Sequence, residues 1–145
     1  MFVSTKNLIR ILIVEDNQFL IDGLAIIIND EPDMKVVGKA NTGSEGLNLA
    51  LCENPDLVLL DIGLGDVCGI DIIPDLINKT DSKVLVMTGM PVFELYEEAL
   101  LNGARGVMIK DNTADVLLHA IRKVMEGEIW LSDSIKQAIS IENLV

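Results

Sequence analysis

Five short apolar segments, each followed by a stretch with helical spacing, constrain the fold of this chain more than any other feature. They begin about 20 to 30 residues apart. Alternating strands and helices of this kind predict a parallel sheet with right-handed crossovers and with helices on both faces. The pattern alone leaves two strand orders open, the doubly wound order 2-1-3-4-5 and the Rossmann order 3-2-1-4-5. The expected strands cover residues 8–14, 34–40, 57–60, 83–88 and 106–110.

The segments between these strands carry apolar residues at helical spacing and end at recognisable stop signals. Asn54-Pro55 ends the second expected helix, and Asn102-Gly103 ends the fourth. Pro74 falls inside the third, where we expect a kink or a shifted start. A further short helix is expected from Ser132 onward. The five main helices are expected near residues 17–29, 41–53, 70–78, 92–101 and 111–126.

Size and charge exclude several classes of protein. The 145 residues fit one ordinary domain, and no apolar run approaches the ~20 residues that a membrane span needs. The N-terminus lacks the apolar core of a signal peptide, so a cytoplasmic location is expected. A net charge of −12 argues against direct binding of nucleic acid or of an anionic membrane. Cys52 and Cys68 form no CxxC pair and are expected to be reduced and at least half-buried.

Polar side chains follow four of the five expected strands. Glu15 and Asp16 come after the first strand, Asp61 after the third, Thr88 after the fourth and Lys110 after the fifth. In the order 2-1-3-4-5 the third strand lies between the first and the fourth, so these groups converge on one pocket. The Rossmann order would scatter them, and no GxGxxG motif follows the first strand. The distribution of polar residues therefore favours the order 2-1-3-4-5.

Three carboxylates in one pocket repel each other unless a cation compensates them. Hard oxygen ligands suit Mg²⁺ better than zinc. Lys110 adds a mobile point charge for a phosphoryl oxygen, and Thr88 adds a hydroxyl. This set predicts phosphoryl transfer onto Asp61, with Glu15 and Asp16 holding the metal. Any one of these acids alone would more often be a solvated loop residue or a helix cap, so the hypothesis depends on their combination.

Over about residues 9–126 the sequence resembles the receiver domain of two-component response regulators. Two further segments, residues 31–38 and 120–132, are similar to the NarL/FixJ-type subfamily, whose members carry a LuxR-like helix-turn-helix domain. The resemblance implies a flavodoxin-like (CheY-like) fold, a doubly wound five-stranded parallel sheet of order 2-1-3-4-5. The motifs that carry it are Val14-Glu-Asp-Asn17, the Asp61-to-Gly69 spacing, Met87-Thr88 and Gly103-Ala-Arg-Gly-Val-Met-Ile-Lys110.

The resemblance assigns roles to the residues of the pocket. Asp61 would accept the phosphoryl group from a sensor histidine kinase, and Thr88 and Lys110 would bind its oxygens. Asp16, Asp61 and the carbonyl of Gly63 would ligate Mg²⁺, with Glu15 acting through a water molecule. The surface from Pro91 to Glu126 would change on phosphorylation and contact partners.

The domain organisation follows from the same resemblance. Residues 1–127 are expected to form the receiver domain, and residues 128–145 a linker or short C-terminal helix in which Trp130 anchors the tail. No output domain is expected within this chain, because the tail shows no recognition-helix pattern. A role in transcription would therefore require a DNA-binding domain outside the chain; a stand-alone receiver is the alternative. A homodimer is also considered, but the sequence does not indicate which face of the domain would form the interface.

Five positions depart from the family pattern or affect the chemistry that it implies. Gly65 replaces the usual proline four residues after the acceptor, so the loop should be more mobile. Val107 replaces the switch aromatic, which removes the usual partner of the threonine in the coupled rotation. Asp111 replaces the proline that usually follows the lysine, a change that the NarL/FixJ-type subfamily shares. Gly63 and Met90 cannot orient an attacking water, which predicts slow self-dephosphorylation.

Two other functions remain open from the sequence. A small Mg²⁺-dependent aspartate-nucleophile phosphatase would also use an acid at a strand end. Such enzymes favour a second acid two residues later, where this chain has Gly63. A receiver-like interaction module that is not controlled by phosphorylation is the third reading, and Gly65 and Val107 are the residues that keep it open.

Overall fold

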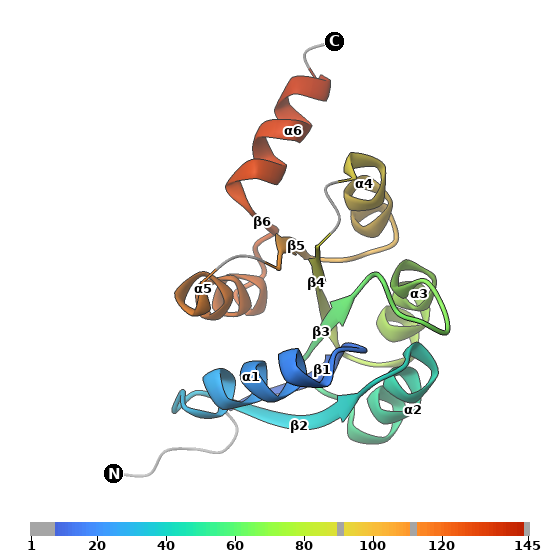
Figure 1. Cartoon of the computed structure of the whole chain (residues 1–145), viewed down its shortest axis with the longest axis vertical. Coiled ribbons are helices and arrows are strands. Elements are labelled where there is room, and N and C mark those ends of the chain that lie inside the picture. Colours follow the sequence, from blue (N-terminus) through green and yellow to red (C-terminus); the bar gives the residue numbers. More distant parts are fainter. Residues whose placement is uncertain (1–7, 90–91, 111–112, 144–145) are drawn as a thin grey trace.

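The computed structural model describes residues 8–89, 92–110 and 113–143, and it forms one parallel sheet flanked by helices (Figure 1). The strand order is β2-β1-β3-β4-β5-β6, so the expected order of the first five strands is confirmed. Parallel pairing places the C-terminal ends of all strands at one edge of the sheet. The strands are β1 (Ile9–Val14), β2 (Met34–Ala40), β3 (Leu57–Asp61), β4 (Lys83–Thr88), β5 (Gly106–Ile109) and β6 (Trp130–Leu131).

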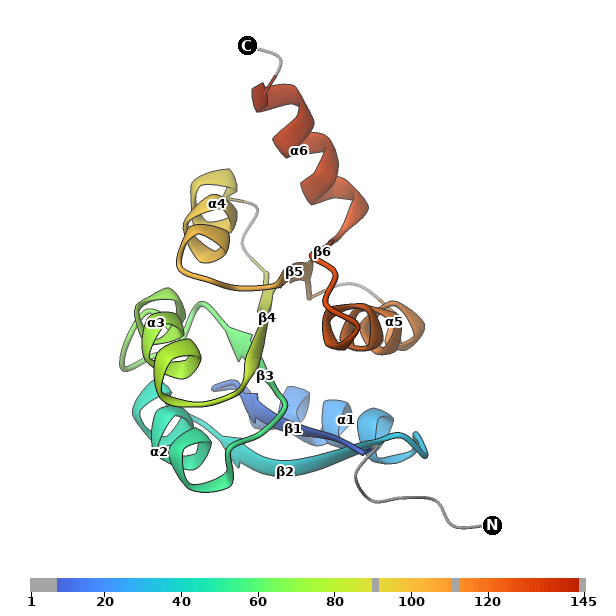
Figure 2. The same ribbon diagram turned by 180° about the vertical axis from the view of Figure 1, so that it is seen from behind.

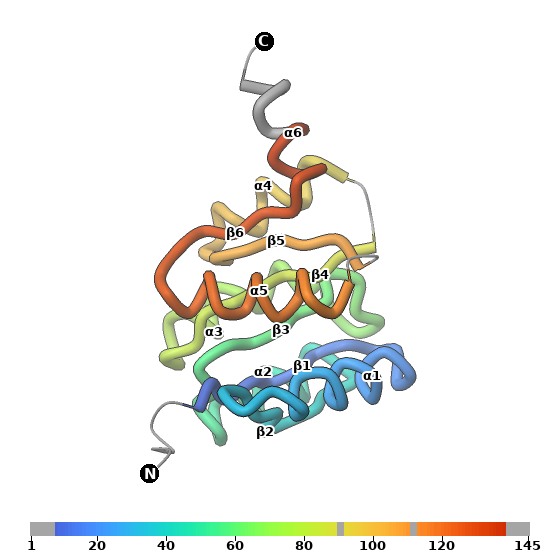
Figure 3. Tube along the Cα trace, turned by 90° about the vertical axis from the view of Figure 1, so that its left-hand side faces the viewer, coloured from blue at the N-terminus to red at the C-terminus, as the bar shows by residue number. Residues whose placement is uncertain are grey.

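Helices cover both faces of the sheet. On one face lie α1 (Gln18–Asn29) and α5 (Ala114–Met125), which Figure 3 shows in front of the strands. On the other face lie α2 (Gly43–Glu53), α3 (Gly69–Lys79) and α4 (Phe93–Leu101), as Figures 1 and 2 show from opposite sides. The last helix, α6 (Asp133–Asn143), lies beyond β6. The doubly wound arrangement expected from the sequence is therefore present.

Polar side chains cap the starts of α1, α2 and α5. The side chain of Asn17 accepts hydrogen bonds from the N–H groups of Phe19 and Leu20 at the start of α1. Thr42 caps α2 and Thr113 caps α5 in the same way. Such caps satisfy N–H groups that have no partner within the helix.

The third helix is not interrupted by its proline. It begins at Gly69, one residue before the expected start, and continues through Pro74 to Lys79. The apolar side chains of α3 hold it against the sheet, because Ile70, Ile73 and Leu76 are all buried. Packing of this apolar side of the helix therefore outweighs the missing backbone donor of the proline.

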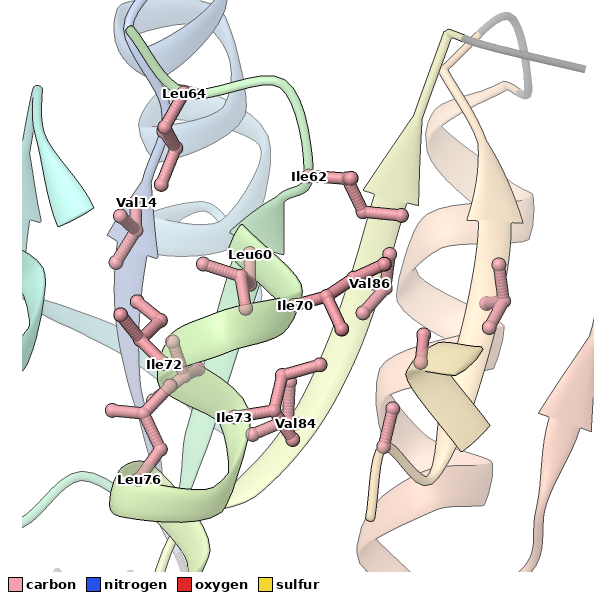
Figure 4. Close-up of a cluster of buried hydrophobic side chains, with 14 of the residues drawn as sticks. Val14, Leu60, Ile62, Leu64, Ile70, Ile72, Ile73, Leu76, Val84 and Val86 are labelled. Atoms are coloured by element: carbon pink, nitrogen blue, oxygen red, sulfur yellow. The ribbon is translucent and has the colours of Figure 1, made fainter. Parts of the chain in front are cut away.

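Alternation along the strands divides the core into two layers. Ile11 and Ile13 of β1 pack under α1 and α5, whereas Leu12 and Val14 point to the opposite layer. β3 and β4 repeat this alternation, and all of these side chains are buried. Figure 4 shows part of the second layer, where residues of β1, β3 and β4 meet Ile70, Ile72, Ile73 and Leu76 of α3. Two filled layers fix the register of every strand, and thus the positions of the strand ends.

A sixth strand joins the expected five. Trp130 donates a backbone hydrogen bond of 3.0 Å to the carbonyl of Arg105, and Ser132 donates one of 3.2 Å to Val107. The Ser132 hydroxyl also accepts from the N–H of Ile109 at 3.1 Å. A strand of two residues is too short to show alternation, which is why the sequence did not indicate it. The expected helix of the tail and the anchoring position of Trp130 are both present.

Cys52 and Cys68 are free, as expected, but their expected burial was wrong, because both are exposed. Cys52 lies on the outer side of α2, and Cys68 precedes the first turn of α3. Neither position is fixed by hydrophobicity, since a small side chain costs little on either side of a helix. Within the described ranges, no helix is long and apolar enough to cross a membrane.

Candidate functional site

Three acidic side chains meet at the C-terminal edge of the sheet. Glu15 and Asp16 follow β1, and Asp61 ends the neighbouring strand β3; ligand oxygens of the three all lie within 4.8 Å of one another. Val14 is level with Leu60 in the paired strands, which brings the residues after them side by side. Glu15 and Asp61 are 2% and 5% exposed, whereas Asp16 faces solvent. The cluster is therefore an open-sided site with two buried carboxylates at its base.

Lys110 supplies the cation nearest to these acids. Its Nζ lies 2.9 Å from Glu15 Oε2 and 3.2 Å from Asp61 Oδ2. Its backbone N–H donates to the carbonyl of Thr88 at 2.9 Å, which joins the ends of β4 and β5. A Cβ built on Gly89 would lie 3.7 Å from Lys110 Cδ, so the lysine stem runs past this glycine. The lysine reaches from the fifth strand back to the first and third.

The pKa values of Glu15 and Lys110 are both raised, but for different reasons. Burial raises the pKa of Glu15, the hydrogen bond from Lys110 opposes this shift, and the charge of Asp61 adds to it. Burial lowers the pKa of Lys110, but the hydrogen bond to Glu15 and the charge of Asp61 outweigh it, so the pKa of Lys110 is raised. Lys110 thus stays charged at neutral pH, beside the carboxylates of Glu15 and Asp61.

The donor set fits a hard divalent cation. Glu15 Oε2 is buried and accepts no hydrogen bond of normal geometry, although Lys110 Nζ lies within ion-pair distance. Carboxylate oxygens with an exposed edge that admits water are the ligands that Mg²⁺ prefers. Among the described residues, Glu15, Asp16 and Asp61 are the His, Cys, Asp or Glu side chains that come close enough together, three at once, to hold a metal ion. A divalent cation would offset the negative charge that one lysine leaves uncompensated.

The loop after Asp61 returns closely to the strand that it leaves. The N–H of Gly63 donates to Asp61 Oδ1 at 3.1 Å, and the N–H of Gly69 donates to the carbonyl of Ile62 at 2.9 Å. A Cβ on Gly69 would lie 2.3 Å from the carbonyl oxygen of Asp61. Glycine at position 69 is therefore required by the close approach of two backbone segments.

The remaining residues of the expected site differ in how directly the structure places them. Thr88 is fully buried at the end of β4, where it pairs with Ile109 of β5. Asp61 ends β3, the neighbouring strand on the other side. Gly63 is tied to the Asp61 carboxylate through its N–H. Val107 is fully buried in β5. Met90 and Asp111 lie outside the described residues. Glu15, Asp61 and Lys110 are thus in contact, Asp16 lies within 4.8 Å of the other two acids, and Thr88 and Gly63 adjoin this group.

One carboxylate with a specific role in the loop was missed in the sequence. Asp66 accepts hydrogen bonds from the N–H of Gly43 at 2.8 Å, from the N–H of Ser44 at 3.0 Å and from the Ser44 hydroxyl at 3.0 Å. These bonds, with that from Gly43 first, lower the pKa of Asp66 to about 2. An acid beside a glycine resembles any solvated turn residue, and no periodic signal distinguishes it.

Comparison with known proteins decides the family. The family model described as the response regulator receiver domain matches residues 11–122. The chain belongs to this family. Receiver domains are parts of two-component response regulators and typically act as signalling switches rather than as enzymes. The match spans β1 to α5 and contains every residue of the cluster.

Relatives of this receiver domain place it near the NarL and LuxR-type regulators. It is 31% identical to the nitrate/nitrite response regulator protein NarL of Escherichia coli over 139 residues, 95% of this chain and 64% of that protein. It is 32% identical to the transcriptional regulatory protein DesR of Bacillus subtilis over 121 residues, 83% of this chain and 60% of that protein. The receiver domain spans about 60 to 65% of the length of the curated relatives that it matches.

A solved structure shows the same architecture over nearly the whole chain. A two-component response regulator of the LuxR family from Aurantimonas superposes with a TM-score of 0.88 at 25% identity. The similarity covers 94% of this chain and 98% of that structure. The structural similarity therefore extends past residue 122, where the family match ends.

Proposed function

We propose that this receiver domain accepts a phosphoryl group on Asp61 from a sensor histidine kinase in the cytoplasm and acts as a phosphorylation-controlled switch. The observation that supports this most directly is the contact set of the site. Asp61 lies 3.2 Å from the Lys110 ammonium and shares the pocket with Glu15 and Asp16. A buried carboxylate between a cation and further oxygen ligands is the arrangement that phosphoryl transfer onto an acid requires.

In the proposed reaction a carboxylate oxygen of Asp61 attacks the phosphorus of the donor's phosphohistidine. The bond between phosphorus and the imidazole nitrogen breaks, its electron pair stays on the imidazole, and an acyl phosphate forms on Asp61. Asp16, Asp61 and the Gly63 carbonyl, with Glu15 through water, would hold Mg²⁺, and the bound ion would offset negative charge on the phosphoryl oxygens. The protein itself needs only to hold the reacting groups in line.

Lys110 and Thr88 are assigned to the phosphoryl oxygens. Lys110 reaches Asp61 Oδ2 directly and is pre-positioned by Glu15, whose two oxygens lie 3.1 and 2.9 Å from its Nζ. A fixed ammonium group loses little entropy when a phosphoryl oxygen arrives beside it. The Thr88 hydroxyl, at the end of the neighbouring strand, would donate to a second oxygen.

An apolar groove adjoins the site and supports the choice of a protein as phosphodonor. It has a volume of about 180 Å³ between α1 and α5, and its lining includes Leu20, Gly23, Leu117 and Lys110. Phe19, which also lines the groove, is 92% exposed. A donor domain that delivers a phosphoryl group to Asp61 would cover this groove, because exposed apolar surface is typical of protein contacts.

The output of the switch is proposed to be control of transcription through a DNA-binding domain outside the described chain. Its relatives include proteins named as transcriptional regulators, and the chain corresponds to about 60% of DesR. With a net charge of −12, the receiver domain is not expected to bind DNA itself. The surface from Pro91 to Glu126 is proposed to contact partners, with a homodimer as one outcome.

Intact mass tests the proposed function. The protein is incubated with Mg²⁺ and acetyl phosphate, alongside an Asp61→Asn variant. We expect the gain of one phosphoryl group, absent from the variant. Continuous release of phosphate without a stable adduct would instead identify a phosphatase. No phosphate gain and no turnover would leave an interaction module that phosphorylation does not control.

The lifetime of the adduct gives a separate prediction. Gly63 offers no side chain to orient a hydrolytic water, and Met90 offers no polar group. We expect the variant carrying Gly63→Asn and Met90→Glu to lose its phosphoryl group about tenfold faster than the wild type, since positioning a reactant often changes rates by this factor or more. Decay is followed by intact mass after the phosphodonor is removed. A wild-type lifetime no longer than that of the variant would contradict the prediction.

A further inference from the structure

Asp66 fastens the loop that follows Asp61 to the N-terminus of α2. We propose that Asp66 is a positioning residue for phosphorylation of Asp61: its side chain holds residues 62–68 in the conformation that the reaction needs. This inference rests on the proposed function, because it concerns the rate at which Asp61 is phosphorylated.

The contacts of Asp66 are made across a long separation in sequence. Both carboxylate oxygens are used: Oδ1 accepts from the N–H of Gly43 at 2.8 Å, and Oδ2 accepts from the N–H and the hydroxyl of Ser44, each at 3.0 Å. The two N–H groups belong to the first turn of α2, where backbone donors lack partners within the helix. A carboxylate placed there also interacts favourably with the helix dipole. The loop and the helix are thus joined by three hydrogen bonds to an anion.

Apolar contacts seat the loop at the same place. A Cβ built on Gly43 would lie 2.3 Å from Val67 Cγ2 and 3.4 Å from Leu64 Cδ1. Leu64 is 9% exposed and belongs to the core layer under α2 and α3. Residues on both sides of Asp66 therefore pack against the start of α2, and glycine at position 43 leaves room for them.

The helix that receives Asp66 is itself fixed against the site. A Cβ built on Gly46 would lie 2.8 Å from both methyl groups of Val14, the last residue of β1. Val14 directly precedes Glu15 and Asp16. The first turns of α2 thus connect the tip of the acceptor loop with the strand that carries the other two carboxylates.

Gly65 explains why this loop needs such a connection. Glycine has more backbone freedom than the proline usual at this place in the family, so the loop loses more entropy when it becomes ordered. Gly65 itself does not have a positive φ, and a Cβ there would meet no atom within 4 Å. The position can therefore accept a side chain, and the order that proline would provide is supplied by Asp66 one residue later.

The first test removes the carboxylate. We expect Asp66→Ala to lower the rate of phosphorylation by acetyl phosphate at saturating Mg²⁺ about tenfold, because misplaced reacting groups lose much of the benefit of positioning. Thr42→Ala is the matched control, because the Thr42 hydroxyl caps the same helix by accepting from the N–H of Glu45, a hydrogen bond within the start of α2 and not to the loop. The control should react at the wild-type rate. Equal slowing by both variants would mean that Asp66 acts only through the stability of α2, and would overturn the proposal.

The second test restores order by another route. Gly65→Pro combined with Asp66→Ala should recover most of the lost rate, whereas Gly43→Ala, which displaces Val67, should slow the reaction with Asp66 intact. Amide hydrogen exchange of residues 62–68 should rise in Asp66→Ala and fall again in the double variant. An Asp66→Ala protein with the wild-type rate and unchanged exchange would overturn the proposal.

The same experiment separates failure of this inference from failure of the proposed function. If the wild type gains no phosphoryl group, the proposed function fails, and hydrogen exchange of the loop still decides whether Asp66 orders it. If the wild type is phosphorylated on Asp61 and Asp66→Ala is as fast, only the role of Asp66 fails. Urea unfolding of each variant confirms that the compared proteins are folded.

Discussion

The backbone after β3 turns so tightly that Gly69 lies against the backbone of Asp61 and Ile62. A Cβ at this position would approach Asp61 O to 2.3 Å and Ile62 Cα to 2.9 Å, and both are backbone atoms that no side-chain rotation can move. Gly65, four residues earlier in the loop that precedes α3, has open space around it. A side chain is therefore excluded at position 69 but can be accommodated at position 65.

This contrast gives a prediction for the free energy of unfolding. Gly69→Ala should lower it by about 2 kcal/mol or more, because the new methyl group overpacks a backbone contact. Gly65→Ala should leave it unchanged or raise it by about 0.5 kcal/mol, because alanine restricts the unfolded chain. Urea unfolding of the two variants checks both values. Equal effects would show that the loop does not pass this close to position 69.

An ion-pair network joins α5 to the connection between α1 and β2. Arg122 donates to Asp33 at 3.0 and 2.9 Å and to Glu31 at 2.6 Å. The hydrogen bonds from Arg122 hold the pKa of Asp33 below its usual value. Arg122 and Asp33 are 38% and 41% exposed at their side chains, so solvent screens the pair and reduces its energy.

The depressed pKa of Asp33 sets the sign of a pH dependence. Its contribution to stability is present above its unfolded value of 3.8 and is lost as the pH falls through the lower folded value. We therefore expect Arg122→Gln to cost about 1 kcal/mol at neutral pH and less towards about pH 3. Urea unfolding across this range measures the difference. Lys123→Gln on the same helix is the control and should cost less; a deficit of Arg122→Gln that is independent of pH would contradict the prediction.

The tail forms a second element-level connection, since β6 and α6 extend the sheet and its core. Ile135 of α6 is 1% exposed and belongs to the layer beneath α4, close to Phe93, Tyr96 and Ile109. We expect Ile135→Ala to lower the free energy of unfolding by about 2 to 4 kcal/mol. Its exposed neighbour Lys136→Ala should change it by less than about 0.5 kcal/mol. If thermal or urea unfolding shows no difference between the two, α6 does not contribute to the folded core.

Taken over the whole molecule, features carried by repeated patterns could be predicted and features carried by single contacts could not. The strand order followed from polar residues at four strand ends, because parallel strands bring these ends together. The two residues of β6 are too few for a pattern, and their pairing depends on backbone bonds to Arg105 and Val107. The contact between Asp66 and Gly43 spans 23 residues, and neither residue type indicates the other. The exposed cysteines were missed because small side chains fit either environment.

The central claim for the whole molecule is that Asp61, among 23 acidic residues, is the one that carries the phosphoryl group. Reduction with borohydride converts an acyl phosphate of aspartate into homoserine, which peptide mass spectrometry can locate after treatment with acetyl phosphate and Mg²⁺. We predict homoserine at position 61, dependent on Mg²⁺ and absent without the phosphodonor. Homoserine at Asp16, at Asp66 or at no position would contradict this account.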